Sequence, residues 1–215
     1  MALLPRPLAL LVGVLALGMG SVAQAADTPA TAELVSGASA PMLAGTCAGC
    51  HGTEGASAGP ATPTIAGMNT DYFIALMRGF RDGKVYSTVM GRISKGYTDE
   101  ELALLAKFFN GKPYVAAAQT FDETLVAKGK TLHDKYCEKC HTKGGTIVKG
   151  DEPGEEDENH ILAGQWTPYL ENAMNDFREG RREMAKKMKS KLEEQRIREG
   201  DAGLKAIFAF YASEK

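Results

Sequence analysis

The sequence has 215 residues, with 25 lysines and arginines against 27 aspartates and glutamates, for a formal net charge of −2. This length suits one or two small domains, and the balanced charge excludes the strongly basic surface typical of nucleic-acid-binding proteins. Only four cysteines are present, so their arrangement bears directly on function.

The first stretch, MALLPRPLALLVGVLALGMGSVAQA, has the order of a secretory signal peptide. One basic residue, Arg6, precedes an apolar run over 8–17, and the small-residue pattern Ala23-Gln24-Ala25 follows. The run is shorter than the roughly 20 residues that cross a bilayer. A retained membrane anchor is the alternative. We predict that 1–25 is cleaved, that the mature chain has no membrane span and that it is exported to the periplasm.

All four cysteines fall in two copies of Cys-x-x-Cys-His, CAGCH and CEKCH. In an exported protein, disulfides are one explanation, and a zinc ion held by four thiolates is another. Neither explains the histidine after each pair. Covalent c-type haem does, because the thiols form thioethers to the haem and the adjacent histidine binds the iron. We predict two covalent haem c groups, held by Cys47, Cys50 and His51 and by Cys137, Cys140 and His141.

The chain also repeats itself outside the cysteine motifs. IAGMNTDYFIALMRGFRDG at 65–83 aligns with LAGQWTPYLENAMNDFREG at 162–180, an offset of 97, whereas the cysteine motifs are offset by 90. The second unit therefore has about seven extra residues, and the acidic stretch DEPGEEDE at 151–158 is the obvious insertion. A period this long indicates tandem domains rather than a solenoid. We predict a first domain over 26–112 and a second over 113–215.

Both units are predicted to be helical. Thr98-x-x-Glu101 and Thr120-x-x-Glu123 each have the form of a capping box that opens a helix. After the second box, an apolar stripe recurs with the helical period at Leu125, Gly129, Leu132 and Tyr136. Units of this size are marginal as purely polypeptide cores, and a buried haem would supply much of the missing apolar contact.

The second axial ligand of each iron is expected to be a methionine, whose soft sulfur favours ferrous iron and raises the reduction potential. In the first unit we predict Met90, seven residues after Gly83 and just before the C-terminal helix. Met68 and Met77 compete, but Met77 lies on the repeated helix and is expected to be a core residue.

The second unit offers two methionines, Met184 and Met188, four residues apart and therefore on one face if both are helical. The same count of seven, taken from Gly180, reaches 187. Met188 misses this position by one residue and Met184 by three, so we favour Met188 and keep Met184 as the alternative. His160 is a third candidate.

Each half resembles a class I cytochrome c, with a haem motif near an N-terminal helix, a methionine-bearing loop and a C-terminal helix ending in aromatic residues. The tandem pair is similar to cytochrome c4. The blocks LHDKYCEKCH, HILAGQWTPYL and MGRISKGY more specifically resemble the cytochrome subunits of flavocytochrome c sulfide dehydrogenases. The resemblance implies an all-α fold of two tandem class I cytochrome c domains, each wrapped around one covalent haem.

The resemblance also implies partners. A periplasmic, sulfide-oxidising flavoprotein that carries the FAD would form a heterodimer with this chain and pass it electrons, and a soluble acceptor such as a small cytochrome c would receive them. The chain would then be no enzyme on its own but a subunit of a sulfide:cytochrome c oxidoreductase complex. The alternative is a free dihaem shuttle that feeds a terminal oxidase. A dihaem peroxidase is a third class, and the methionine candidates argue against the open iron that it requires.

Class I cytochromes commonly orient the proximal histidine through a Gly-Pro carbonyl after the motif, which implies Gly59-Pro60 for His51. They also place a small residue eight positions before the first cysteine, against the C-terminal helix; Ser39 and Gly129 hold those positions here.

Three further features remain to be placed. His133 is expected to pack near the haem, with a role in proton transfer as the alternative, and Trp166 is expected either against the haem or at a partner surface. The segment 178–198 holds nine lysines and arginines against four glutamates and is a candidate docking surface.

Overall fold

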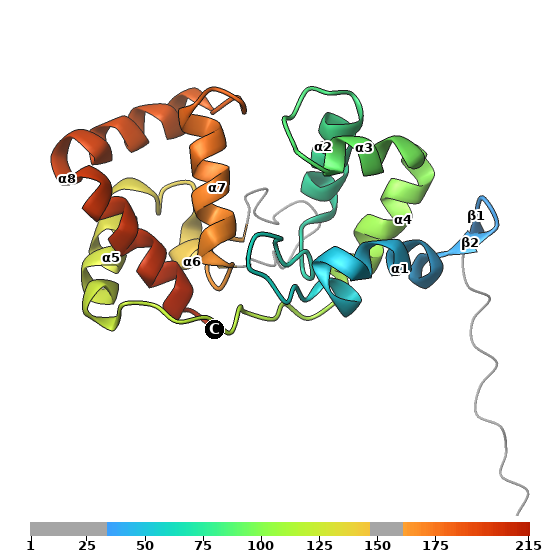
Figure 1. Cartoon of the computed structure of the whole chain (residues 1–215), viewed down its shortest axis with the longest axis horizontal. Coiled ribbons are helices and arrows are strands. Elements are labelled where there is room, and N and C mark those ends of the chain that lie inside the picture. The colour runs from blue at the N-terminus through green and yellow to red at the C-terminus, as the bar shows by residue number, and fades with distance from the viewer. Residues whose placement is uncertain (1–33, 147–160) are drawn as a thin grey trace, which may run out of the picture. The chain divides into compact units, whose positions relative to one another are not determined.

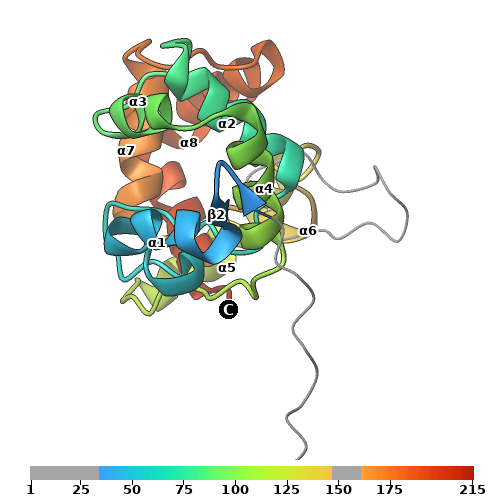
Figure 2. The same cartoon turned by 90° about the vertical axis from the view of Figure 1, so that its right-hand side faces the viewer.

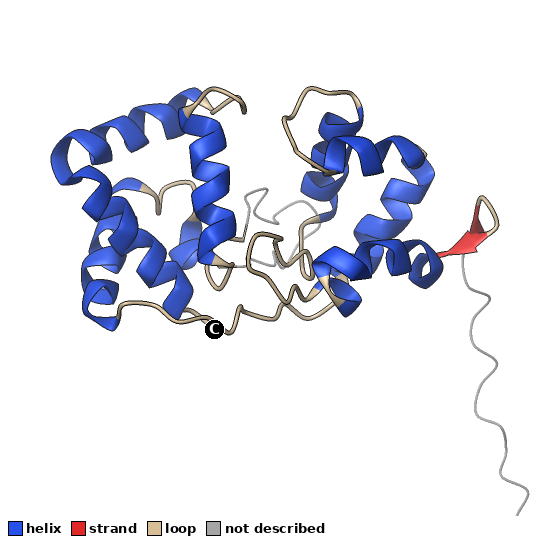
Figure 3. Cartoon of the chain, viewed as in Figure 1, coloured by secondary structure: helices blue, strands red, loops and turns tan. Residues whose placement is uncertain are grey.

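The computed structural model describes residues 34–146 and 161–215. All of them belong to one compact body, Glu33–Lys215, which contains both of the repeated units. The predicted signal peptide, the acidic insertion at 151–158 and His160 lie outside the described residues. The described part is predominantly helical, with one small antiparallel pair formed by β1 (Leu34–Val35) and β2 (Ala38–Ser39) (Figures 1 and 3).

The helical elements fall into two sets along the chain. The first comprises α1 (Ala40–His51), η1 (Thr53–Gly55), α2 (Thr70–Arg81), α3 (Met90–Ile93), η2 (Ser94–Gly96) and α4 (Asp99–Asn110). The second comprises α5 (Glu123–Tyr136), α6 (Thr142–Gly145), α7 (Thr167–Arg178) and α8 (Lys186–Ser213). None of the helices within the described ranges is both long and apolar enough to cross a membrane.

Helix α4 begins where the sequence predicts it, at a capping box. The Thr98 side chain accepts from the backbone N–H of Glu101, and the Glu101 carboxylate accepts from the backbone N–H of Thr98. Each set has its own apolar core, and α4 supplies the centre of the first, where Leu102 and Leu105 are fully buried. Helix α4 contacts both α1 and α2 (Figure 2), so this core ties the cysteine-bearing helix to the repeated one.

Helix α5 begins differently from the prediction. Its N-cap is Asp122, whose carboxylate accepts from the backbone N–H of Thr124, so the capping box expected at Thr120 is wrong. An Asp that directly precedes the helix can reach the first free N–H groups without the reciprocal partner that a box requires. The expected apolar stripe is present. Gly129, Leu132 and Tyr136 are buried, and Leu125 packs partly buried against the second core.

Gly129 is where α5 crosses α8. A Cβ atom at this position would lie 2.0 Å from the carbonyl oxygen of Ala206, a contact that no side chain tolerates. Only glycine allows this approach, which confirms the expected role of Gly129. Ser39, its counterpart, instead ends β2 and forms the N-cap of α1, where it is only partly buried.

The sequence repeat is also a structural repeat. Helices α2 and α7 have equal lengths and begin at the aligned residues Thr70 and Thr167. Before each helix a glycine with positive φ donates to a carbonyl at the end of the C-terminal helix: Gly67 to Phe109 at 2.8 Å and Gly164 to Tyr211 at 2.7 Å. Each turn therefore fastens the repeated helix to the end of its own unit.

The units differ most before their C-terminal helices. In the first unit α3, η2 and α4 are separate, whereas α8 runs for 28 residues, with a single non-helical residue, Gly200, at φ 63°. Glycine adopts this conformation without strain, so the chain bends there and continues as the helix that packs on α5. Because α8 begins at Lys186, Met184 precedes the helix and does not share a helical face with Met188.

Candidate functional site

The first cysteine motif occupies the last turns of α1, and His51 is the final residue of that helix. Cys47 packs partly buried against the first core, Cys50 is exposed, and His51 is 9% exposed. Residues three and four apart on a helix share a face, so the thiols and the imidazole are presented on one side of α1.

The imidazole of His51 is oriented by a backbone carbonyl. Its Nδ1 lies 2.9 Å from the carbonyl oxygen of Pro63, and an N–H that donates there leaves Nε2 available to a metal. Burial lowers the pKa of His51, which favours the neutral imidazole that binds iron.

The carbonyl at Gly59-Pro60, expected for this contact, is not the one used. The Ser57 hydroxyl donates to the carbonyl of Thr62 at 2.7 Å, and the Ser57 backbone N–H donates to the Thr64 hydroxyl at 3.2 Å. These bonds close the loop on itself and present the carbonyl of the next proline, Pro63, to His51.

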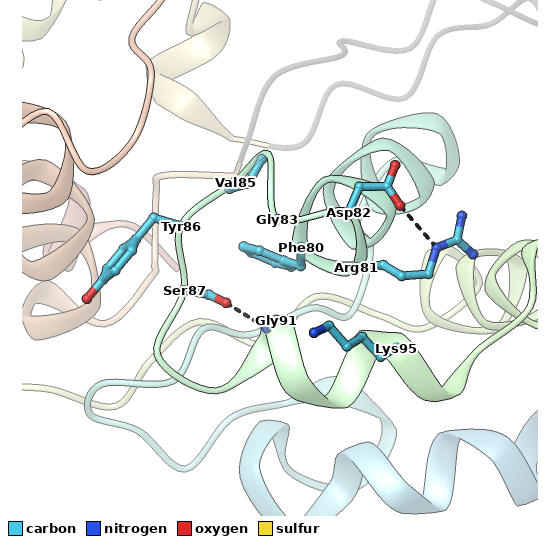
Figure 4. Close-up of a pocket in the computed structure, with 9 residues that line it drawn as sticks. All are labelled: Phe80, Arg81, Asp82, Gly83, Val85, Tyr86, Ser87, Gly91 and Lys95. Atoms are coloured by element: carbon cyan, nitrogen blue, oxygen red, sulfur yellow. Dashed lines mark hydrogen bonds and ion pairs between the residues drawn. The ribbon is translucent and has the colours of Figure 1, made fainter.

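Met90 is the first residue of α3 and lies partly buried against the same core as Cys47. Its loop is fixed on both sides, because Ser87 Oγ accepts from the Gly91 N–H at 2.6 Å and Ser94 Oγ donates to the Met90 carbonyl at 2.6 Å. Figure 4 shows the open pocket of about 330 Å³ beside this loop, which is lined by Phe80, Arg81, Asp82, Gly83, Val85, Tyr86, Ser87, Gly91 and Lys95.

The competing methionines of the first unit lie elsewhere. Met77 is 6% exposed within the first core, as predicted for a packing residue, and Met68 packs partly buried against the same core.

The second cysteine motif lies beyond the end of its helix. Cys137 is the C-cap of α5, partly buried against the second core, while Cys140 is exposed and His141 directly precedes α6. Burial raises the pKa of the Cys137 thiol to about 11 and raises that of Cys47 as well. All four thiols of the chain are free. Two thiols and a histidine on one short segment fit covalent haem in both units, with no disulfide to compete.

The structure places both methionine candidates of the second unit at the start of α8. Met188 lies in its first turn, Met184 lies two residues before it, and both are half-buried. The choice between them remains a prediction.

His133 forms a buried network that the sequence did not foresee. It is fully buried, its Nδ1 lies 2.9 Å from the Tyr211 hydroxyl, and its Nε2 lies 2.6 Å from Glu138 Oε2. Glu138 also accepts from the backbone N–H groups of Lys143 and Gly144. Since Glu138 lies inside the second cysteine motif, the network ties the motif to the C-terminal helix.

Trp166 lies neither on a free surface nor within its own unit alone, because its side chain contacts the first unit. Its Nε1–H donates to the carbonyl of Ser57 at 3.1 Å, and its ring lies so close to Gly59 that a Cβ there would come within 2.2 Å of the indole. Next to it, Gln165 is 3% exposed and makes two hydrogen bonds to the backbone of Thr64. No sequence signal indicates these contacts beyond the replacement of Met68 by Gln165 in the repeat.

Arg182 makes a second link between the units. It donates to the carbonyl of Tyr86 at 3.0 Å and lies 3.5 Å from the carboxylate of Asp176 in its own unit. Other cations of the basic segment are paired as well. Within α8 the ion pairs are Lys191–Glu194, Arg196–Glu193 and Arg198–Glu194, and Arg178 at the end of α7 pairs with Asp201 next to the bend in α8. This pairing reduces the free positive charge of the expected docking surface.

No protein-family model matches the sequence. The chain is 31% identical over 179 residues to cytochrome c4 of Pseudomonas aeruginosa, across 79% of this chain and 80% of that protein. It is 46% identical over 68 residues to the cytochrome subunit of sulfide dehydrogenase from Chlorobaculum tepidum, which is 32% of this chain and 61% of that relative. The reduced recombinant cytochrome c4 of Pseudomonas stutzeri has the same fold, with a TM-score of 0.65 at 20% identity over 82% of this chain and 97% of that structure.

Fold and motifs together define a dihaem c-type cytochrome built from two class I cytochrome c domains, with two covalent haem c groups. Within that class, the chain belongs to the cytochrome c4 family and is an electron carrier.

Proposed function

We propose that this cytochrome is the dihaem subunit of a sulfide-oxidising flavocytochrome. It would accept electrons from a partner flavoprotein that carries FAD and pass them to a soluble acceptor such as a small cytochrome c. The observation that carries the proposal is the 46% identity to a sulfide dehydrogenase cytochrome subunit over 68 residues, well above the 31% identity to a cytochrome c4. Two one-electron centres match the two electrons of a reduced flavin.

A ligand set completes the proposal. His51 and Met90 are the axial ligands in the first unit, and His141 and Met188 are those in the second, with Met184 as the alternative to Met188. Thioethers form at Cys47, Cys50, Cys137 and Cys140. Haem supplies reversible one-electron chemistry when bound. The chain's own contribution is to orient His51 through Pro63, to hold the Met90 loop through Ser87 and Ser94, and to shield both sites with apolar cores.

The ligand set is tested by the spectrum of the oxidised protein. Methionine bound to ferric haem gives a weak long-wavelength charge-transfer band, and two such haems should give twice the intensity of one. Absence of the band together with rapid cyanide binding would overturn the assignment.

The partner is tested by gentle affinity purification of the mature protein from its native periplasm. We expect a stoichiometric flavin-bearing chain and reduction of the haems when sulfide is added. A lone dihaem protein that sulfide does not reduce would favour the second candidate, a free shuttle to a terminal oxidase. The match to cytochrome c4 over 79% of this chain supports that candidate.

Export and domain limits are part of the same proposal. We expect the mature protein to begin at Ala26, to be periplasmic, and to consist of domains over 26–112 and 113–215. Mass spectrometry of the purified protein and limited proteolysis around 112–113 test these points.

A further inference from the structure

The peptide group between Pro63 and Thr64 is held at both ends by side chains. Its carbonyl oxygen lies 2.9 Å from His51 Nδ1, and its N–H donates to Gln165 Oε1 at 3.0 Å. A peptide group is a single conjugated unit, so charge displaced at the nitrogen is felt at the oxygen. A continuous path of hydrogen bonds therefore leads from a side chain of the second unit to the proximal histidine of the first.

Gln165 is held rigidly for this contact. Its Nε2 donates to the Thr64 carbonyl at 2.7 Å, so the side-chain amide of Gln165 is hydrogen-bonded to both the N–H and the carbonyl of Thr64. Its backbone carbonyl accepts from Gln119 Nε2 at 2.7 Å, while Gln119 Oε1 accepts from the Thr167 N–H at 2.8 Å. Thr64 is 1% exposed and Gln165 is 3% exposed, so water does not compete for these bonds. Buried chains of hydrogen bonds polarise one another, by roughly 10–30% per bond.

We propose that Gln165 is a positioning residue for His51 and lowers the reduction potential of the first haem. By accepting from Thr64 N–H it makes the Pro63 carbonyl a stronger acceptor. The Nδ1–H of His51 is then drawn further toward that carbonyl, and Nε2 becomes a stronger donor that favours ferric iron. One haem is thus tuned by the unit that holds the other. The inference rests on the proposed role of His51 as an iron ligand.

The test replaces Gln165 by methionine, the residue at the aligned position 68, in the full-length holoprotein. The potentials of both haems are measured by spectroelectrochemical titration, and the ring N–H resonance of His51 is recorded by NMR spectroscopy of the reduced, diamagnetic protein. We expect the first haem to become easier to reduce by about twofold in its equilibrium constant, or about 18 mV for one electron. The His51 ring N–H resonance should move upfield as its hydrogen bond to the Pro63 carbonyl weakens, while the second haem is unchanged.

Trp166→Phe is the matched control. It removes the indole hydrogen bond to Ser57, one residue away at the same contact, and leaves the Pro63–Thr64 peptide untouched. We expect no shift of either potential. If Gln165→Met does not fold, Gln165→Asn, which keeps the amide but is too short to reach Thr64, is measured in its place and should shift the first haem in the same direction.

The outcomes separate the relay from the ligand assignment. A Met90→His variant should lower one potential strongly and so identify the first haem. If it does so and the wild type shows haem-shifted His51 ring resonances, but Gln165→Met changes neither the potential of the first haem nor the His51 N–H resonance, the relay is wrong and the ligands stand. Equal shifts of both haems, or a shift in Trp166→Phe, also contradict the relay. Absence of haem-shifted His51 ring resonances from the wild-type spectrum would overturn the ligand assignment and the relay with it.

Discussion

The two halves of the molecule share the contacts that connect their helices but differ in the contacts around the cysteine motif and the methionine candidates. In both, an arginine in the last turn of the repeated helix pairs with an aspartate of the C-terminal helix, which is the first residue of α4 in one half and follows the Gly200 bend of α8 in the other. Arg81 lies 2.8 Å from Asp99, and the aligned Arg178 lies 2.9 Å from Asp201. In both, a glycine turn fastens the repeated helix to the end of its unit. These shared contacts hold the elements around each cysteine motif in a fixed arrangement.

The halves diverge on the methionine side and around the motif. In the first, hydroxyl groups fix the loop of Met90, and the motif ends a helix. In the second, α8 begins at Lys186, close to both methionine candidates. The cysteine motif follows the end of α5 and is held by the buried hydrogen bonds of His133. The contacts between helices are thus shared, whereas the surroundings of each iron are specific to each half.

The largest expected effect comes from the axial methionines. Met90→Ala should remove one methionine–iron band and lower one potential by the order of tenths of a volt. Met188→Ala should do the same for the other haem, while Met184→Ala leaves both bands in place. Absorption spectra and redox titrations measure this. Met77→Leu, in the first core, is the control and should change neither band; the reverse result for 184 and 188 would exchange their roles.

The next effect concerns the closest helix crossing. Gly129→Ala would place a methyl group against the backbone of Ala206, so α5 and α8 must separate. We expect a loss of about 3 kcal/mol in the free energy of unfolding, measured by denaturant titration of the holoprotein. Gly45→Ala in α1, where an added Cβ meets nothing within 4 Å, is the matched control and should be neutral or slightly stabilising. Equal losses for both variants would contradict the comparison.

A smaller, pH-dependent effect is expected at Glu138. Burial raises the pKa of its carboxyl, but hydrogen bonds from Gly144, His133 and Lys143 outweigh burial and leave the pKa below its usual value. Its stabilising contribution is therefore present above the unfolded-state pKa and is lost as pH falls through the lower folded value. With a side chain 39% exposed, solvent screening limits the contribution to about 1 kcal/mol.

Glu138→Gln tests this contribution. The variant should be less stable than the wild type at neutral pH, and the difference should vanish as pH falls through the lowered folded-state pKa of Glu138, because the wild-type carboxyl is then neutral as well. Unfolding free energies across that range measure it. A difference that does not depend on pH would show that the carboxylate charge is not responsible.

The smallest effect is expected at the repeated arginine–aspartate pair. Asp99 binds both Arg78 and Arg81, whereas within the described residues the ion pair of Asp201 is with Arg178 and the Asp201 side chain is 83% exposed. Asp99→Asn should therefore destabilise slightly more than Asp201→Asn, and both losses should shrink in high salt. Thermal unfolding at low and high ionic strength measures this, and a larger loss for Asp201→Asn would reverse the ranking.

The sequence by itself determined whatever depends on neighbouring residues or on repetition. The two haem motifs, the repeat at 65–83 and 162–180 and the capping box at Thr98 are readable from spacing, and the close approach at Gly129 is implied by the resemblance to class I cytochromes. Each is decided by residue types a few positions apart, or by one unit that resembles the other. For that reason the all-α fold and the two haem groups were predictable.

Only the tertiary structure decided what depends on contacts across the chain. Pro63 rather than Pro60 faces His51 because Ser57 closes a loop that spacing does not encode. Trp166 and Gln165 meet the first unit from about a hundred residues away, where no local period points. Met184 lies before α8 because that helix begins at Lys186 and continues through a bend at Gly200. Such choices follow from the packing of whole elements, since each local segment is compatible with several partners until the others are in place.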